Sequence, residues 1–289
     1  MVEGIIVILF IVSLPLLWML IFSFERNASN WSATKESELT VIVPFRNEEE
    51  RIGPLLESLR QELNKTSYAV HVLFVDDHSV DGSVDLINRF CAEFNGSVKL
   101  RSLTSSSSGK KAAVRLGVEN ASTTWVLTLD ADVTLPKGYF GHIRFPEKGS
   151  MVIHPVRMKG NGTIQGFFSM EFLLFQAYTF TRGVWMANGA NLLFKAHDFI
   201  AMEAFRTDNS VASGDDMFLL NEMRKQKLIV RKNPDYRLVS DTMAPRTLFE
   251  GLNQRIRWVG KMIHLTNNVP MMISMLFSAL ICIVWVGAI

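Results

Sequence analysis

Two carboxylates separated by one residue, Asp130 and Asp132, close a short apolar run that covers residues 127 to 129. If that run is a buried strand, its period of two sends both side chains to the same side at the carboxyl end. Ligands of open α/β sheets bind at that end. Paired carboxylate oxygens suit Mg²⁺ or Mn²⁺, and either ion suits the phosphates of a nucleotide. The pair therefore predicts a metal site beside a phosphate site.

A second acidic pair, Asp76 and Asp77, follows another apolar run, residues 70 to 75. The segment that continues to Gly82 also has ideal turn and cap chemistry, with Ser79 or Asp81 placed to cap the next helix. Acidic pairs are common in turns and at caps, so each pair has a structural interpretation beside the functional one. The two interpretations are compatible.

Strands and helices alternate in the first half of the chain, which predicts right-handed crossovers and a mostly parallel α/β sheet. Beyond Pro136 the pattern loosens. A strand is predicted over residues 151 to 156, and an aromatic-rich helix over 166 to 186 that packs in the core or faces a membrane or acceptor. The predicted early strands are 39–44, 70–75, 98–103 and 125–129, and the predicted helices are 54–63, 84–94 and 112–120.

Two uncharged blocks, residues 4 to 24 and 269 to 289, are each long enough to cross a bilayer as a helix. No Lys or Arg precedes the first block, which favours an anchor over a signal peptide. The sequence stops inside the second block, as expected of a fragment of something longer. Basic residues follow the first block and precede the second, so the positive-inside rule predicts an integral protein of a bacterial inner membrane with a cytoplasmic central domain.

Composition excludes other classes. The formal net charge of +2 is too small to indicate a nucleic-acid partner. The two cysteines, Cys91 and Cys282, cannot build a disulfide framework, which agrees with a reducing compartment.

Several segments, in this order, resemble a membrane-bound glycosyltransferase of family 2 with a GT-A fold. The likeness extends to ceramide-glucosyltransferase-like and cellulose- and hyaluronan-synthase-like enzymes. It implies a transmembrane anchor (1–26), a linker (27–38), a GT-A domain (39–246), an amphipathic interfacial helix (247–266) and a C-terminal transmembrane helix (267–289). The segments that carry it are residues 40–50, 75–82, 109–113, 130–132, 189–191, 214–216 and 254–258.

The resemblance implies a role for each matching residue. Asp130 and Asp132 would hold Mg²⁺ or Mn²⁺, with the stronger contact on Asp132. Asp216 would be the catalytic base, with Asp215 as the alternative acid, although both could merely cap the helical run that follows. The acceptor-side segment would be Gly189, Ala190 and Asn191. The implied nucleotide-sugar-binding residues are Pro44, Arg46, Glu48, Asp76, Asp77, Lys110, Asp130, Gln254, Arg257 and Trp258.

Helical spacing places Gln254, Arg257 and Trp258 within one turn of each other. Arg257 suits bidentate contact with a phosphate, and Trp258 offers a flat apolar platform for a sugar. Apolar residues from Leu248 to Ile263, bordered by basic ones, also describe a helix that lies in a membrane interface. We expect this helix to serve both purposes.

The expected function is inverting, metal-dependent transfer from a nucleotide-sugar, a UDP-sugar, to a membrane-associated acceptor, a lipid. A growing glycan is the alternative acceptor, as in a processive polysaccharide synthase. Alternatives from other classes are a nucleotidyltransferase and a catalytically inactive, nucleotide-sugar-binding membrane subunit. The sequence does not predict the oligomeric state.

Overall fold

The computed structural model describes residues 31–63, 65–94, 96–182, 184, 186–203 and 215–262. The predicted anchor (1–26) and C-terminal membrane helix (267–289) lie outside these residues, as do Gly214 and the end of the predicted interfacial helix. Among the helices that are described, none has the length and apolarity needed to cross a bilayer.

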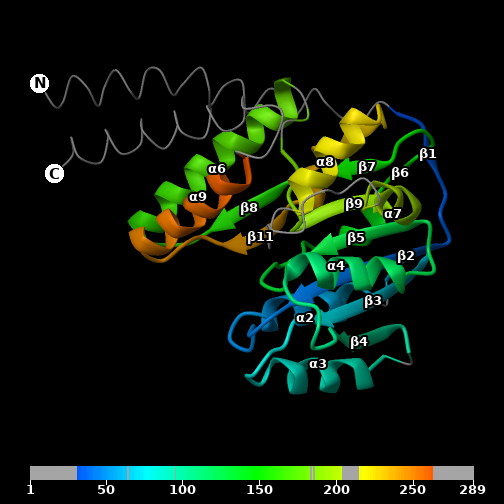
Figure 1. Cartoon of the computed structure of the whole chain (residues 1–289), viewed down its shortest axis with the longest axis horizontal. Helices are drawn as coiled ribbons and strands as arrows, with labels where there is room; N and C mark the ends of the chain where they lie inside the picture. Colours follow the sequence, from blue (N-terminus) through cyan, green and yellow to red (C-terminus); the bar gives the residue numbers. More distant parts are fainter. Residues whose placement is uncertain are drawn as a thin grey trace, which may run out of the picture.

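The described residues form a seven-stranded sheet in the order β10-β7-β9-β5-β2-β3-β4 (Figure 1). Strands β5, β2, β3 and β4 are mutually parallel, whereas β9 runs antiparallel to both β5 and β7. The strands are β2 (Glu38–Phe45), β3 (Ala69–Asp76), β4 (Val98–Ser102), β5 (Trp125–Leu129), β7 (Met151–Ile153), β9 (Asn191–Lys195) and β10 (Val230–Lys232).

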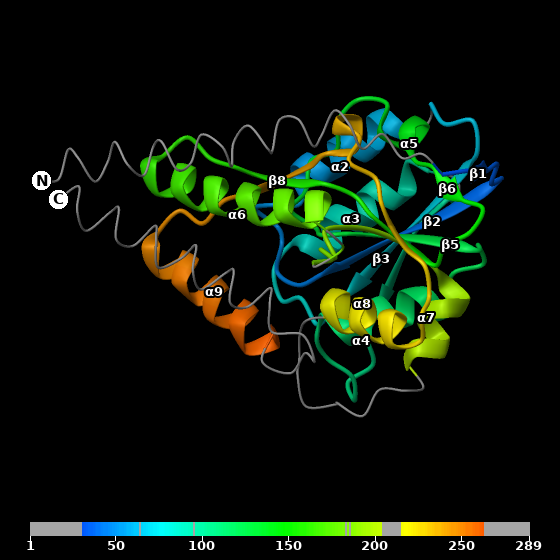
Figure 2. The same cartoon turned by 90° about the horizontal axis from the view of Figure 1, so that it is seen from above.

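Helices cover both faces of this sheet, which explains why its central strands are apolar throughout. Figure 2 shows α4 (Lys110–Glu119), α7 (Ala196–Glu203) and α8 (Asp215–Lys225) on one face, and α2 (Gly53–Glu62) and α5 (Tyr139–His142) on the other. Helix α3 (Ser83–Ala92) packs beside β4. The contact between α4 and β2 is close, because a Cβ at Gly117 would lie 2.5 Å from Ile42 Cγ2.

The strand predicted over residues 151 to 156 is two strands. β7 ends at Ile153, and β8 (Val156–Lys159) joins a separate two-stranded parallel sheet with β11 (Ser240–Met243). Pro155 lies at the break, where it has no backbone N–H for a ladder. A further small sheet pairs β1 (Ala33–Thr34) with β6 (Phe145–Pro146).

The β8–β11 sheet leads into two long helices, α6 (Thr163–Arg182) and α9 (Leu248–Met262). Both views show these helices extending together from the same end of the main sheet (Figures 1 and 2). We call α6 and α9 the helical arm. It is attached to the main sheet by β8 and β11, and a short 3₁₀ helix, η1 (Tyr236–Leu238), precedes β11.

One buried histidine makes the stability of this fold depend on pH. His154 has no exposed surface, and its Nδ1 lies 3.2 Å from Asn191 Oδ1. Burial lowers the pKa of His154 to about 4. Because the folded pKa is below the unfolded value of about 6.5, the unfolded chain binds the proton more readily. Neutral His154 should therefore not reduce the free energy of unfolding above pH 6.5. As the pH falls to 4, the free energy of unfolding should decrease by up to about 3 kcal/mol.

The measurement is the thermal unfolding midpoint of the purified chain between pH 4 and 7.5. His154→Asn keeps an amide donor for Asn191 but cannot titrate, so its curve should be flatter than that of the wild type across this range. The half-buried His71 provides the control, and His71→Asn should follow the wild-type curve. Parallel curves for His154→Asn and the wild type would contradict the assignment.

Candidate active site

The loops that follow β2 and β3 are joined by reciprocal hydrogen bonds, and we call them the paired loops (residues 46–50 and 76–83). Ser79 Oγ accepts from the Asn47 N–H at 3.0 Å, and Asn47 Oδ1 accepts from the Val80 N–H at 2.8 Å. Each loop therefore supports the other at the carboxyl end of the sheet. Three further bonds join the loops: the Glu48 N–H donates to the Ser83 side chain, the Glu49 N–H to that of Asp81, and the Gly82 N–H to that of Glu49.

Asp76 and Asp77 are both 6% exposed and hold this end of the sheet together. Asp76 Oδ1 accepts from the Ser79 N–H at 2.9 Å, which is the turn chemistry that the sequence suggests. Asp77 Oδ1 accepts from the Gly109 N–H at 2.9 Å, and Asp77 Oδ2 lies 3.6 Å from Nη1 of the exposed Arg46. Gly109 has a φ of +93°, a conformation that favours glycine, and starts α4 at Lys110.

Asp130 and Asp132 follow β5 directly, as predicted. Asp132 Oδ2 accepts from Thr242 Oγ1 on β11 at 2.9 Å, and Lys110 on α4 makes an ion pair with Asp130. Burial raises the pKa of Asp132, and the neighbouring Asp130 carboxylate raises it further, against the lowering effect of the Thr242 hydrogen bond. Two acids thus share one site, and the negative charge of Asp130 makes ionisation of Asp132 less favourable.

Glu48 faces the same acids from the paired loops. Burial raises the pKa of Glu48 to about 7, Arg51 opposes this shift, and Asp132 and Asp130 add to it. Arg51 Nη2 donates to Glu48 Oε1 at 3.0 Å. Within the described residues, no three His, Cys, Asp or Glu side chains already enclose a metal position. The donor set nevertheless fits a divalent cation, because hard oxygens converge and their charges repel.

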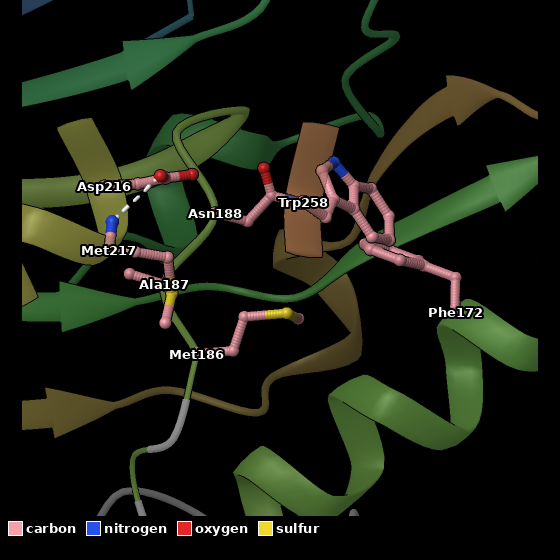
Figure 3. Close-up of a pocket in the computed structure, with 7 residues that line it drawn as sticks. All are labelled: Phe172, Met186, Ala187, Asn188, Asp216, Met217 and Trp258. Atoms are coloured by element: carbon pink, nitrogen blue, oxygen red, sulfur yellow. Dashed lines mark hydrogen bonds between the residues drawn. The ribbon is translucent and has the colours of Figure 1, made fainter. Parts of the chain in front are cut away.

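A pocket lies on the other side of Lys110, and Asp216 at the start of α8 provides its carboxylate. Asp216 Oδ2 accepts from the Gly189 N–H at 3.0 Å, and Oδ1 accepts from the Met217 N–H at 2.8 Å. In Figure 3, Asp216 enters from α8 and Trp258 from α9, with Asn188 between them. The lining residues are Phe172, Met186, Ala187, Asn188, Asp216, Met217 and Trp258.

Gly189 brings the pocket and the acidic cluster together. A Cβ at this position would lie 3.5 Å from Lys110 Nζ and 3.7 Å from Asp216 Oδ2. Since Lys110 also pairs with Asp130, three segments far apart in the sequence converge on one small region. Asp216 and Asp130 are therefore linked through Gly189 and Lys110.

Of the predicted acceptor-side segment, Gly189 contacts the site through its backbone, whereas the Asn191 side chain has no exposed surface. Asn191 Oδ1 accepts from Tyr139 Oη at 2.5 Å, and its Nδ2 donates to the carbonyls of Pro155 and Leu238. Asn191 thus supports the backbone behind the pocket. The pocket-lining amide is Asn188, whose Oδ1 accepts from the Ala190 N–H at 3.0 Å.

Helix α9 carries Gln254, Arg257 and Trp258, as predicted. The Trp258 ring reaches the pocket and lies 5.8 Å from the Phe172 ring of α6, whereas Arg257 is exposed. Gln254 Oε1 accepts from Arg255 Nη1 at 2.5 Å. Only Trp258 of the three lines this pocket.

Gly251 permits the close crossing of α9 over α6, because a Cβ there would lie 1.8 Å from Phe168 Cζ. Gly251→Ala should force the two helices apart and destabilise the fold by about 1–3 kcal/mol, measured as a lower thermal unfolding midpoint in detergent. The matched control is Gly166→Ala in α6, where a Cβ meets nothing within 4 Å. That variant should be as stable as the wild type or more so, by about 0.5–1 kcal/mol. Equal midpoints for both variants would refute the crossing.

Sequence reasoning missed some neighbours of the site. Arg51 could have been found, since it lies three residues after Glu48 and the two are joined across one turn by the Arg51 N–H to Glu48 carbonyl bond at 2.9 Å. Thr242 and Asn188 gave no local signal, because each reaches the site through strand pairing or a loop from a distant part of the chain.

With this geometry established, the comparison with known families is informative. Residues 40–189 match the model of "Glycosyl transferase family 2". The chain belongs to this family. The match covers β3, β4 and β5 and all but the first two residues of β2, includes both Asp130 and Asp132, and ends at Gly189 beside the pocket.

Two curated relatives are similar in sequence. An undecaprenyl-phosphate 4-deoxy-4-formamido-L-arabinose transferase of Aeromonas hydrophila is 36% identical over 98 residues, which is 34% of this chain and 30% of that enzyme. A mouse dolichyl-phosphate beta-glucosyltransferase is 32% identical over 143 residues, or 45% of this chain and 41% of the relative. This chain thus aligns with less than half of each relative.

Among solved structures, a mannosyltransferase, PcManGT from Pyrobaculum calidifontis, in complex with GDP-Man and Mn²⁺, has a TM-score of 0.63 and 18% identity. The alignment covers 91% of this chain and 74% of the other. The likeness confirms the expected α/β fold of the GT-A type, with a mostly parallel central sheet.

Proposed function

We propose that this glycosyltransferase moves a sugar from a nucleotide-sugar, a UDP-sugar, to a lipid acceptor at a membrane, with inversion of the anomeric carbon and a divalent cation. The observation that carries the proposal is the arrangement around Gly189. It places the Asp216 carboxylate beside Lys110, and Lys110 beside the Asp130–Asp132 pair. The proposed catalytic base, Asp216, and the proposed diphosphate site at Asp130 and Asp132 then lie on two sides of Lys110.

The donor side is assigned to the acidic cluster and its neighbours. Asp130 and Asp132 would hold Mg²⁺ or Mn²⁺, which when bound supplies positive charge against the departing diphosphate. The Mn²⁺ and GDP-mannose named for the Pyrobaculum structure support this assignment. Lys110 adds a second positive charge. In the paired loops, Asp76 and Asp77 are assigned to the nucleobase and ribose of the sugar nucleotide.

The acceptor side is assigned to the Asp216 pocket. As the acceptor hydroxyl attacks the anomeric carbon, its proton passes to Asp216 and the bond to the diphosphate breaks on the opposite face. One displacement inverts the configuration. Asp216 is suited to this role because two backbone N–H groups fix its carboxylate at the pocket wall, which reduces the reorganisation needed during attack.

A lipid acceptor is supported by the apolar surroundings of this pocket. Phe172, Met186, Met217 and Trp258 line it. Helix α9 also exposes one apolar face, formed by Leu248, Phe249, Leu252 and Ile256 at 46%, 73%, 54% and 67% exposure. Such a face suits the interface of a membrane. The lipid phosphates in the names of the two relatives agree with this class.

The test is to incubate membranes containing the full chain with radiolabelled UDP-sugars and lipid extract, with and without EDTA. We expect one discrete labelled lipid, free UDP, and loss of product with EDTA that Mg²⁺ or Mn²⁺ restores. A ladder of growing products would instead support a polysaccharide synthase. Release of sugar 1-phosphate in place of UDP would support a nucleotidyltransferase. Binding of UDP-sugar with no product in any extract would favour an inactive binding subunit.

A further inference from the structure

One arginine of α9 points into the protein although its helix is exposed on the opposite face. Arg255 is 7% exposed, and its partner Glu171 on α6 is 3% exposed. Arg255 Nε donates to Glu171 Oε2 at 2.7 Å, and Nη2 bonds to the same oxygen. The pair joins the two helices of the arm from within.

The guanidinium of Arg255 also lies over two aromatic rings. Its Cζ is 4.4 Å from the centre of the Trp258 ring and 4.8 Å from that of Phe168. The remaining nitrogen, Nη1, donates to Gln254 Oε1 at 2.5 Å. One planar cation therefore lies over two rings and donates to two polar partners.

We propose that Arg255 is a positioning residue that fixes the Trp258 ring at the wall of the acceptor pocket. The inference rests on the proposed function, since it takes the Trp258 wall to contact the acceptor. Arg255 itself does not line the pocket. It acts through the ring, which the guanidinium and Phe172 contact at 4.4 Å and 5.8 Å.

Stability alone does not account for this arrangement. Buried ion pairs can often be replaced by apolar pairs of similar volume without loss of stability, whereas removal of one partner strands a buried charge. What an apolar pair cannot reproduce is the attraction between a cation and the face of an indole, together with the directed bonds that fix the plane of the cation. The geometry thus serves the orientation of Trp258 more than the cohesion of the arm.

An apolar replacement of the ion pair can therefore separate the stability of the arm from the orientation of Trp258. The full-length, membrane-embedded chain is prepared as Arg255→Met, as Glu171→Met, and as the double variant. The single variants should unfold at lower temperature. The double variant should unfold near the wild-type temperature, yet its KM for the lipid acceptor should rise by about tenfold, with UDP-sugar affinity unchanged.

The matched control is Arg60→Met with Glu93→Met, an exposed arginine that also bonds two-fold to a glutamate and lies 5.4 Å from the Phe90 ring. It should leave the acceptor KM unchanged. Adding Trp258→Ala to the Arg255→Met, Glu171→Met chain should produce no further rise beyond Trp258→Ala alone, since both changes act through one ring. Independent, multiplicative losses, or a wild-type acceptor KM in the stable double variant, would overturn the proposal.

A second readout does not depend on catalysis. Subtracting the fluorescence of a Trp258→Phe chain isolates the Trp258 emission, and the Arg255→Met, Glu171→Met change should shift that difference spectrum and increase its quenching by acrylamide. If no sugar transfer is found but the emission shifts, the proposed function fails and the positioning role stands. An unchanged difference spectrum would refute the positioning role whatever the chain transfers.

Discussion

Asp216→Asn is expected to reduce the turnover of sugar transfer by about 10²- to 10⁴-fold, the usual contribution of a positioned general base. An amide has nearly the shape of a carboxylate but cannot take the acceptor proton. It can still accept one of the two backbone hydrogen bonds, from Gly189 or Met217, that now hold Asp216. The loss should therefore appear in kcat, measured with saturating UDP-sugar and lipid, while the affinity for UDP-sugar stays near the wild-type value.

The neighbouring acid provides the matched control. Asp215 begins α8, but its side chain lies outside the described part of the structure. Asp215→Asn should retain most of the activity if Asp216 is the base. If Asp215→Asn loses turnover while Asp216→Asn keeps it, the roles are exchanged and the pocket described here is not where the proton is removed.

Asp132→Asn should reduce the kcat/KM of metal-dependent transfer by about 10³-fold, because the variant loses a hard anionic ligand at the predicted cation site. The release of charge onto the diphosphate would then lack its main compensation. The effect is measured by recording transfer activity and, independently, UDP binding as functions of Mn²⁺ concentration. In the variant, the midpoints of both curves should move to much higher Mn²⁺ concentration.

Thr242→Val is the graded partner of that experiment. It removes only the 2.9 Å hydrogen bond to Asp132 Oδ2 and leaves the carboxylate in place. Residues that orient a metal ligand in this way commonly contribute about 10- to 100-fold in metal affinity, so a shift of that size in the Mn²⁺ curve is expected. An Asp132→Asn chain with the metal dependence of the wild type would exclude Asp132 as a ligand.

Much of the parallel half of the fold follows from local sequence. The strand predicted over residues 125–129 is β5 to the residue. The predictions for β2 and β3 are one residue short at each end, and the prediction for β4 is one residue too long. These strands are buried on both faces, so their apolar runs stand out. The positions of Asp130 and Asp132 follow at once from the end of β5.

The antiparallel part could not be predicted in the same way. Strand β9 lies between β5 and β7 in the sheet but comes after α6 in the chain, and it enters directly from the segment that the sequence assigned to the acceptor. Which partners a strand takes is decided by distant residues. For the same reason Asn191, recognised as part of a motif, proved to be a buried support, while Asn188 lines the pocket.

The pairing of α6 with α9 was likewise invisible in sequence. Arg255 appeared to be one more basic residue on the border of an amphipathic helix. Its partner Glu171 is 84 positions away, in a helix whose aromatic pattern allowed several environments. Only the three-dimensional crossing, which Gly251 makes possible, separates the buried Arg255 from the exposed Arg257.

The hydrogen bonds between the paired loops mean that neither loop can be redesigned alone. Across the gap, Asn47 donates through its N–H to Ser79 Oγ and accepts through Oδ1 from the Val80 N–H, so replacing one loop removes partners of the other. A swap that transplants one loop from a relative would lose these bonds and move Glu48 as well. Under the proposed assignment of the nucleotide to these loops, a change of preferred nucleotide requires both loops to be exchanged as one cassette.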